Sequence, residues 1–286
     1  MSVSYITDLT GKTAVVTGGG GVLCSEFSKA LAECGAKIAV LDLFEEAAKR
    51  TSDAVNANGG YALPYACDVL KKETLIDIRE KIISDFGSID ILINGAGGNS
   101  PKATTAQEFL TAEDLETKEG SDTLNFFDLK PEGFNFVFNL NILGTLLPTQ
   151  VFSEYMAKHG GGCIVNVSSM NAYRPLTKIP AYSAAKAGIS NLTMWLAVHF
   201  SKLNIRVNAI APGFFVTGQN EKLLFDKEGK PTARTEKILA ATPMGRFGNP
   251  AELIGTLLFL CDTKASSFVN GIIIPVDGGF SAYSGV

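Results

Sequence analysis

The stretch KTAVVTGGGGVLCSEFSKALAECGAKIAVLD, residues 12–42, contains a complete strand–helix–strand unit. The apolar, β-branched run at 12–17 predicts a strand, and four glycines, Gly18 to Gly21, follow it directly. Residues 22–34 carry a helical pattern, and 38–41 form a second apolar run. This order predicts two parallel strands joined by a crossover helix.

The same alternation continues along the chain. Further strands are expected at 62–66, 89–93, 163–167, 205–210 and 271–276, and further helices at 45–56, 71–86, 131–158, 181–203 and 251–260. Because the strands are apolar on both faces, we expect a parallel sheet covered by helices on each side. This is a doubly wound Rossmann-type α/β fold, forming a single domain over 1–286.

Two stretches interrupt the rhythm. Residues 98–130 are polar and too long for an ordinary loop, so they are interpreted as an insertion with some local helix. Residues 213–245 form a second irregular stretch, interpreted as a lid that closes over a substrate and excludes water.

Composition narrows the function further. The 286 residues are 46% hydrophobic and carry a net charge of −4 without a basic block, which argues against nucleic-acid or membrane partners. No apolar run approaches the length of about 20 residues that spans a bilayer. The N-terminus has no secretory signal pattern, and the five cysteines are scattered, so we expect a cytoplasmic protein with reduced thiols. The two histidines have no close ligand partners, and no metal site is expected.

The glycine turn is typical of a pyrophosphate site. Glycines let the backbone approach the phosphates, and the helix N-terminus supplies amide donors. Asp42 lies 21 residues after Gly21, the spacing at which an acidic side chain accepts hydrogen bonds from the adenosine ribose. An acid there repels a 2′-phosphate, so NAD(H) is favoured over NADP(H). The alternatives are a tight turn without a ligand and an Asp42 that caps a helix.

Separated motifs in a fixed order resemble the short-chain dehydrogenase/reductase superfamily. They are the turn at Thr17, Asn94-Gly95-Ala96-Gly97, Asn141, Ser168-Ser169, Tyr182-Ser183-Ala184-Ala185-Lys186, and Pro212-Gly213 with Thr217. The resemblance implies a catalytic set of Asn141, Ser169, Tyr182 and Lys186. It implies a cofactor site of Thr17, Gly18, Gly19, Gly21, Val22, Leu23, Asp42, Asp68, Val69, Asn94, Gly95, Ala96, Gly97, Tyr182, Lys186, Pro212, Gly213, Phe215 and Thr217.

The chain departs from the family pattern at three positions. Val22 and Cys24 stand where two glycines are usual in the first turn, and Gly21 is expected to replace one of them a residue earlier. Gly95 stands where the family usually has a second asparagine. The changes at Val22 and Cys24 affect how closely the first helix approaches the cofactor, and the change at Gly95 is mild.

Tyr182 and Lys186 are four residues apart and therefore share one face of a helix. A neighbouring ammonium favours the phenolate, so we expect Lys186 to lower the pKa of Tyr182 and make it a proton-transfer group. Ser169, at a strand end, would bond the substrate oxygen, with Ser168 as the competing choice. The resemblance makes Asn141 the residue that organises a proton-relay water to Lys186; the alternative is a buried asparagine satisfied by backbone.

The loop between Ser169 and Tyr182 must lie near the substrate. Asn171, Arg174 and Lys178 suit an anionic substrate, because arginine can clamp a carboxylate with two parallel bonds. Solvated loop charges or an intersubunit contact are the alternative.

Several strings, among them residues 20–24 and 280–286, resemble the D-mannonate oxidoreductase (fructuronate reductase) branch of the superfamily. This resemblance implies interconversion of D-fructuronate and D-mannonate. A keto-gluconate reductase, a general sugar or polyol dehydrogenase, and a non-catalytic NAD(H)-binding sensor or scaffold are the alternatives. The family also implies a homodimer or homotetramer.

Overall fold

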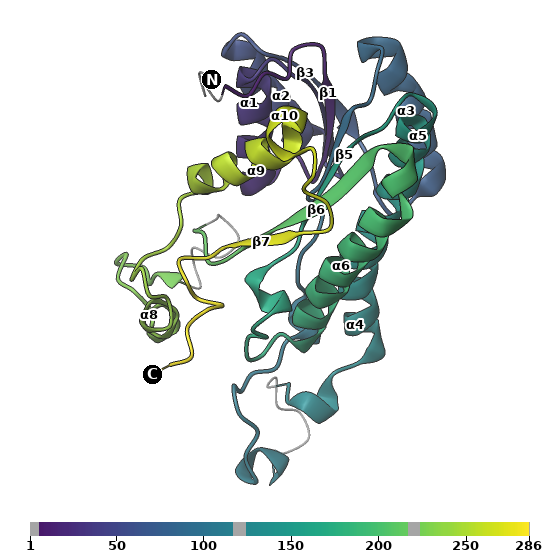
Figure 1. Ribbon diagram of the computed structural model, residues 1–286. Helices are drawn as coiled ribbons and strands as arrows, with labels where there is room; N and C mark the ends of the chain where they lie inside the picture. The colour runs from purple at the N-terminus through teal and green to yellow at the C-terminus, as the bar shows by residue number, and fades with distance from the viewer. Residues whose placement is uncertain (1–5, 117–123, 217–223, 286) are drawn as a thin grey trace.

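Seven parallel strands form one sheet in the computed structural model, which describes residues 6–116, 124–216 and 224–285. The strand order is β3-β2-β1-β4-β5-β6-β7 (Figure 1). The strands are β1 (Thr13–Thr17), β2 (Lys37–Asp42), β3 (Tyr61–Ala66), β4 (Ile91–Asn94), β5 (Gly162–Val167), β6 (Ile205–Pro212) and β7 (Ile273–Val276). Every predicted strand is present, with bounds that differ from the expectation by at most two residues.

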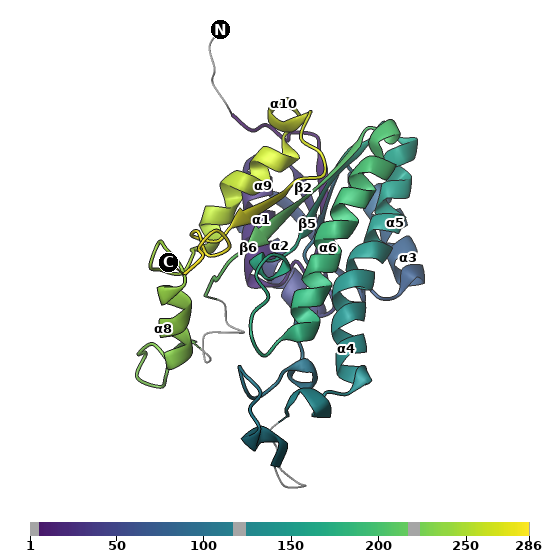
Figure 2. The same cartoon turned by 60° about the horizontal axis from the view of Figure 1, so that its bottom comes forward.

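Helices cover both faces of the sheet (Figure 2). One face carries α1 (Val22–Glu33), α2 (Glu45–Ala57) and α9 (Ile254–Cys261); the other carries α3 (Lys72–Phe86), α5 (Gly144–Lys158) and α6 (Pro180–His199). Two hydrophobic clusters fill the two interfaces, and Val15 belongs to one while its neighbours Ala14 and Val16 belong to the other. This double burial confirms the doubly wound α/β fold in a single domain.

The helix expected over 131–158 consists of three parts. They are α4 (Pro131–Phe138), a π-helical turn (Asn139–Leu143) and α5. The stretch Pro131–Lys158 is long and apolar enough to cross a membrane by length and composition, although the sequence indicated no such run. Half of the relevant window is buried in the fold, which is the condition of a core helix in a layered α/β domain.

The stretch 213–245 contains a helix that the sequence did not indicate, whereas the insertion contains local helical turns, as expected. α8 (Ala233–Ala240) lies within 213–245, and α10 (Thr263–Ser266) follows α9. In its described parts, 98–116 and 124–130, the insertion contains the short 3-10 turns η1 (Pro101–Ala103), η2 (Glu113–Glu116) and η3 (Phe126–Asp128). Further 3-10 turns are η5 (Met170–Ala172), η6 (Ser201–Leu203) and η7 (Pro250–Leu253). All five cysteines are free thiols, as expected.

Candidate active site

The sequence-predicted site residues gather at the carboxyl edge of the sheet. β1 pairs with β2 on one side and with β4 on the other, so the connections that leave β1 and β4 diverge. In open parallel sheets, ligands bind in the crevice that such a divergence leaves at the carboxyl ends of the strands. Thr17, Asn94 and Val167 end β1, β4 and β5 at this edge.

The glycine turn between β1 and α1 brings three segments close together. Gly18 has a φ of +62°, which favours glycine, and a Cβ there would lie 3.0 Å from the Ala96 Cα. A Cβ on Gly20 would lie 2.5 Å from the Ala47 Cβ of α2. Gly21 is the N-cap of α1 and has no side chain to cap the first turn. The first amides of a twelve-residue helix therefore point toward the crevice, where they suit an anion such as pyrophosphate.

Asp42 ends β2 beside this turn. Its Oδ2 accepts a hydrogen bond from the Gly20 amide at 3.0 Å, and its Oδ1 accepts one from the Phe44 amide at 3.1 Å. The Gly19 amide donates to the Leu41 carbonyl at 2.9 Å. Phe44, not Asp42, is the N-cap residue of α2. The carboxylate is thus fixed next to the glycine turn, and the helix-cap alternative does not describe it.

Two departures from the family pattern lie against each other. Cys24 is buried in α1, and a Cβ on Gly95 would overlap its Sγ and lie 2.8 Å from the Thr17 carbonyl oxygen. The sulfur thus fills the volume that a side chain at position 95 would need. Thr17 Oγ1 also accepts hydrogen bonds from the Gly95 and Ala96 amides, at 3.1 and 3.3 Å. The two substitutions therefore compensate, and α1 stays packed against the β4 turn. Val22, the third departure, is 41% exposed at the start of α1.

Asn94, one of the expected cofactor-site residues, has a buried side chain. The residue is 1% exposed, and its amide donates to Thr149 Oγ1 at 2.9 Å and to Asn166 Oδ1 at 2.8 Å. The side chain therefore braces the end of β4 against α5 and β5 rather than facing an open groove.

The remaining nucleotide-side residues flank the crevice. Asp68 Oδ1 accepts from the Leu70 amide at 3.0 Å, and Lys71 lies 3.9 Å from its other oxygen. Val69 is 7% exposed, and Leu23 packs half-buried against the core. Asp68 is thus oriented by its own turn, beyond the end of β3.

Asn141 lies fully buried in the π-helical turn between α4 and α5. Its Nδ2 donates to the carbonyls of Gly98, at 2.7 Å, and Val137, at 2.8 Å. A Cβ on Gly97 would lie 2.7 Å from Asn141 Oδ1 and 3.2 Å from Lys186 Nζ. Backbone carbonyls thus accept both hydrogen bonds of the Asn141 side-chain amide. Because Gly97 has no side chain, Asn141 and Lys186 can both lie close to it. π-Helical turns often occur at functional sites.

Lys186 is a buried ammonium. The residue is 4% exposed, and its Nζ donates to the Val167 carbonyl at 2.8 Å. Burial lowers the pKa of Lys186 to about 8. Nζ lies 5.6 Å from the centroid of the Tyr182 ring, one helical turn earlier on α6. A lysine with this pKa can release and recover a proton near neutral pH.

The pKa of Tyr182 differs from the sequence-based expectation. Burial raises the pKa of its hydroxyl above the ordinary value, and the hydrogen bond with Ser169 lowers it by a smaller amount. The sequence predicted a pKa lowered by the ammonium of Lys186. That prediction was wrong for the cofactor-free protein, because loss of solvent around the phenolate outweighs the favourable contacts. The resting state is therefore a neutral phenol.

The two serines after β5 have separate roles. Ser169 hydrogen-bonds Tyr182, and its Oγ also accepts from the Asn171 amide at 3.3 Å. Ser168 Oγ lies 2.7 Å from Ser190 Oγ and donates to the Lys186 carbonyl at 3.2 Å. Ser168 thus fixes α6 to the sheet, and Ser169 is the serine that stands beside Tyr182.

The predicted substrate loop is only partly assembled around this centre. Asn171 is 4% exposed, and its Oδ1 has no hydrogen-bond partner among the described residues. Arg174 Nε donates to the Ser281 carbonyl at 3.1 Å, so the C-terminal segment holds this arginine. Lys178 has a φ of +71°, and its carbonyl accepts from the Thr105 amide at 2.8 Å. Arg174 and Lys178 therefore contact different segments.

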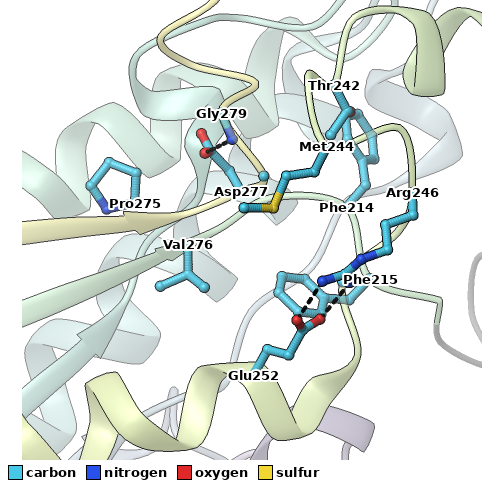
Figure 3. Close-up of a pocket in the computed structure, with 12 residues that line it drawn as sticks. Phe214, Phe215, Thr242, Met244, Arg246, Glu252, Pro275, Val276, Asp277 and Gly279 are labelled. Atoms are coloured by element: carbon cyan, nitrogen blue, oxygen red, sulfur yellow. Dashed lines mark hydrogen bonds and ion pairs between the residues drawn. The ribbon is translucent and has the colours of Figure 1, made fainter.

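A cavity of about 350 Å³ opens beside the ends of β6 and β7 (Figure 3). Phe214, Met244 and an ion pair between Arg246 and Glu252 contribute to its lining. Its lining does not include Ser169, Tyr182 or Lys186, so the cavity lies beside the reacting centre rather than at it.

The segment after β6 holds the last predicted cofactor residues. The Gly213 amide donates to the Val276 carbonyl at 2.9 Å, directly after Pro212. A Cβ on Gly213 would lie 2.5 Å from the Asp277 Cα, so glycine permits this close approach to the end of β7. Phe215 is 5% exposed and packs into the core. Thr217 lies outside the described residues.

A glycine turn, a carboxylate after β2 and a Ser–Tyr–Lys group at one sheet edge are typical of nucleotide-dependent dehydrogenases. The chain belongs to the short-chain dehydrogenase family, whose model matches residues 12–228. An uncharacterized oxidoreductase of Haemophilus influenzae is 58% identical over 286 residues, covering 100% of this chain and 99% of its own. The uncharacterized oxidoreductase UxuB of Bacillus subtilis is 51% identical over 280 residues, 98% of each chain. The 2-dehydro-3-deoxy-D-gluconate 5-dehydrogenase of Escherichia coli is 33% identical over 275 residues, 96% of this chain and 97% of its own.

Solved structures agree with this assignment. A Haemophilus influenzae protein with bound NAD, provisionally described as a D-mannonate oxidoreductase, superposes with a TM-score of 0.91 at 58% identity, covering 98% of each chain. An NAD+-bound xylitol dehydrogenase superposes with a TM-score of 0.81 at 30% identity, covering 95% of this chain and 99% of its own.

Proposed function

We propose that the chain is an NAD(H)-dependent oxidoreductase that interconverts a keto sugar acid and its hydroxy acid, with D-fructuronate and D-mannonate as the pair. The observation that carries the proposal is the meeting of Ser169, Tyr182 and Lys186 at the sheet edge that also bears the glycine turn. This arrangement suits proton transfer beside a bound dinucleotide.

The residues at the turn fit NAD(H). The N-terminus of α1 would hold the pyrophosphate, and Asp42 would accept hydrogen bonds from the adenosine ribose while repelling a 2′-phosphate. Lys186 would hold the nicotinamide ribose, and Asn141, in the π-helical turn between α4 and α5, would organise a proton-relay water to Lys186. NAD(H) supplies the hydride when bound; the protein orients the substrate and handles the proton.

The proton transfer would involve Tyr182, Ser169 and Lys186. A neutral Tyr182 can donate its proton to a carbonyl oxygen during reduction, while Ser169 steadies that oxygen as charge develops on it. Lys186, whose pKa is about 8, can then return a proton toward the phenolate. The raised pKa keeps Tyr182 protonated before the reaction, so the phenol is ready to act as the donor in carbonyl reduction.

The substrate class rests on polar groups near this centre and on related proteins. Asn171 Oδ1 is buried without a partner among the described residues, which suits a substrate hydroxyl as donor. Lys178, with Arg174 as a second candidate, supplies positive charge for a carboxylate. The similar Haemophilus influenzae structure is provisionally described as a D-mannonate oxidoreductase, and the Escherichia coli relative acts on a keto sugar acid by name.

The Escherichia coli relative supports a keto-gluconate reductase as the second candidate. The similarity to xylitol dehydrogenase supports a general sugar or polyol dehydrogenase as a further candidate. The test is a kinetic screen of keto sugar acids and neutral ketoses with NADH and NADPH. The readout is the loss of absorbance of the reduced cofactor. The proposal requires faster turnover of acids than of neutral ketoses of equal length. NADH binding without turnover of any carbonyl substrate would make the chain a sensor or scaffold instead.

We further propose that a second copy covers the outer face of α6. Met194, Trp195 and Val198 are 45%, 57% and 77% exposed there, and Phe136 of α4 is 55% exposed. Exposed apolar groups that gather on one face mark association surfaces, and a homodimer or homotetramer would cover them. Light scattering at two protein concentrations tests this; a monomer at both would contradict it.

A further inference from the structure

One ion pair joins the insertion to α8. Glu108 Oε2 lies 2.8 Å from Lys237 Nζ, although the two residues are 129 positions apart in the sequence. The insertion and α8 extend from the same end of the molecule (Figures 1 and 2). This is the end at which Ser169 and Tyr182 lie, because it holds the carboxyl ends of the strands. Glu108 therefore places a carboxylate at the approach to the reacting centre.

Three cations act on Glu108: Lys237 through a contact, and Lys178 and Arg234 through longer-range attraction. Lys237, Lys178 and Arg234 each lower its pKa, with the hydrogen bond from Lys237 as the largest cause. The three cations come from two separate segments, α8 and the loop that leads into α6. Glu108 and these three cations together carry a formal charge of +2.

Lys178 is held in place at a conformational cost. Its φ of +71° is in the left-handed region, which is unfavourable for a residue with a side chain. The Thr105 amide, three residues before Glu108, bonds the Lys178 carbonyl at 2.8 Å and keeps it there. Strained residues of this kind tend to occur at ligand clamps. Lys178 is also only four residues before Tyr182, so its ammonium is close in sequence to the proton donor.

We infer that Lys178, Arg234 and Lys237 form the binding site for the carboxylate of the substrate, and that Glu108 occupies this site until the substrate enters. The inference rests on the proposed function, since it assigns the charged end of a sugar acid whose carbonyl lies at Tyr182. It also replaces the clamp expected from sequence: Arg174 is held by the C-terminal segment, whereas Lys178 belongs to a different set of cations.

Glu108 and the substrate carboxylate then compete for the same partners. Removing the charge of Glu108 should tighten binding of an acid, whereas removing any of the three cations should weaken it. A purely structural ion pair predicts the opposite sign for Glu108, because losing it would loosen the insertion from α8. The sign of the effect therefore separates the two interpretations.

The experiment is a calorimetric titration of D-gluconate, a sugar acid without a ketone, into the NADH-loaded protein. We expect Glu108→Gln to lower the Kd by about two- to five-fold, the range of exposed ion pairs. Lys237→Met and Arg234→Met should each raise it by about the same factor. Lys178→Asn, which keeps a residue tolerant of positive φ, should act in the same direction. Lys230→Met is the matched control, because Lys230 pairs with Glu228 outside the cluster, and it should leave the Kd unchanged.

The neutral analogue D-sorbitol should respond to none of these variants. A weaker or unchanged affinity for D-gluconate in Glu108→Gln overturns the inference, and so does the absence of D-gluconate binding in both the wild type and that variant. Failure of the proposed substrate class would look different: neutral ketoses would be turned over faster than keto acids while D-gluconate still bound in the predicted order.

Discussion

The buried ammonium of Lys186 should make the cofactor-free protein less stable than its uncharged counterpart. Burial lowers the pKa of Lys186 from the ordinary 10.5 to about 8. At about 1.4 kcal/mol for each pKa unit, carrying the charge near pH 7 costs the folded state about 3 kcal/mol. Lys186→Met keeps the apolar stem but loses the hydrogen bond to the Val167 carbonyl, worth about 1 kcal/mol. The variant should therefore be more stable at pH 7 by about 2 kcal/mol, while losing turnover.

The pH dependence has a definite sign. Between about pH 8 and 10.5 the unfolded chain still binds the proton that folded Lys186 releases, so the wild type gains stability as pH rises. Met at this position gains nothing, and the stability gap should shrink by about 1 kcal/mol between pH 7 and 9. Urea unfolding at fixed protein concentration measures the gap, with exposed Lys202→Met as control. A variant that is less stable than wild type at pH 7, or a gap that does not change with pH, would show that burial of the Lys186 charge does not destabilise the fold.

The other predictions concern the cofactor turn and the proton donor. Gly95→Ala should lower the free energy of unfolding by about 1–3 kcal/mol, because the new Cβ overlaps Cys24 Sγ and lies 2.8 Å from the Thr17 carbonyl oxygen. Cys24→Ala in the same chain should restore the part of the loss that is due to the sulfur, and strictly additive losses in a double-mutant cycle would contradict the compensation. Tyr182→Phe should reduce kcat by about 10²–10⁴-fold with unchanged NADH affinity in a fluorescence titration, and retained activity would remove Tyr182 from its role. Asp42→Ala should narrow the preference for NADH over NADPH, judged from the ratio of kcat/KM values; an unchanged ratio would argue against the ribose contact.

Most of the fold could be predicted because its strands are buried on both faces. A run such as Val15–Val16 is apolar on both sides of the sheet, and glycines mark the turns that follow. α8 escaped prediction because eight residues give a short pattern within a polar stretch. The π-helical turn at Asn141 also escaped, since the apolar pattern of 131–158 continues through it without a break.

The sequence could predict which residues form the site, but it could not predict their pKa values and contacts. Residue type could not separate Ser168 from Ser169; the hydrogen bond between Ser168 and Ser190 does so in the folded chain. The pKa of Tyr182 depends on how much solvent it loses, which a spacing of four residues to Lys186 does not report. The pairing of Glu108 with Lys237 depends on two segments that meet only through the fold.

The central claim is that Tyr182 donates the proton as a hydride reaches the ketone of a sugar acid. It is tested most directly by following NADH absorbance after D-fructuronate is added to the wild-type protein and to Tyr182→Phe. We expect rapid NADH oxidation by the wild type and a rate near background for the variant, with both proteins binding NADH equally. Equal rates in the two proteins would contradict the role of Tyr182, and NADH binding without oxidation in the wild type would contradict the proposed reaction.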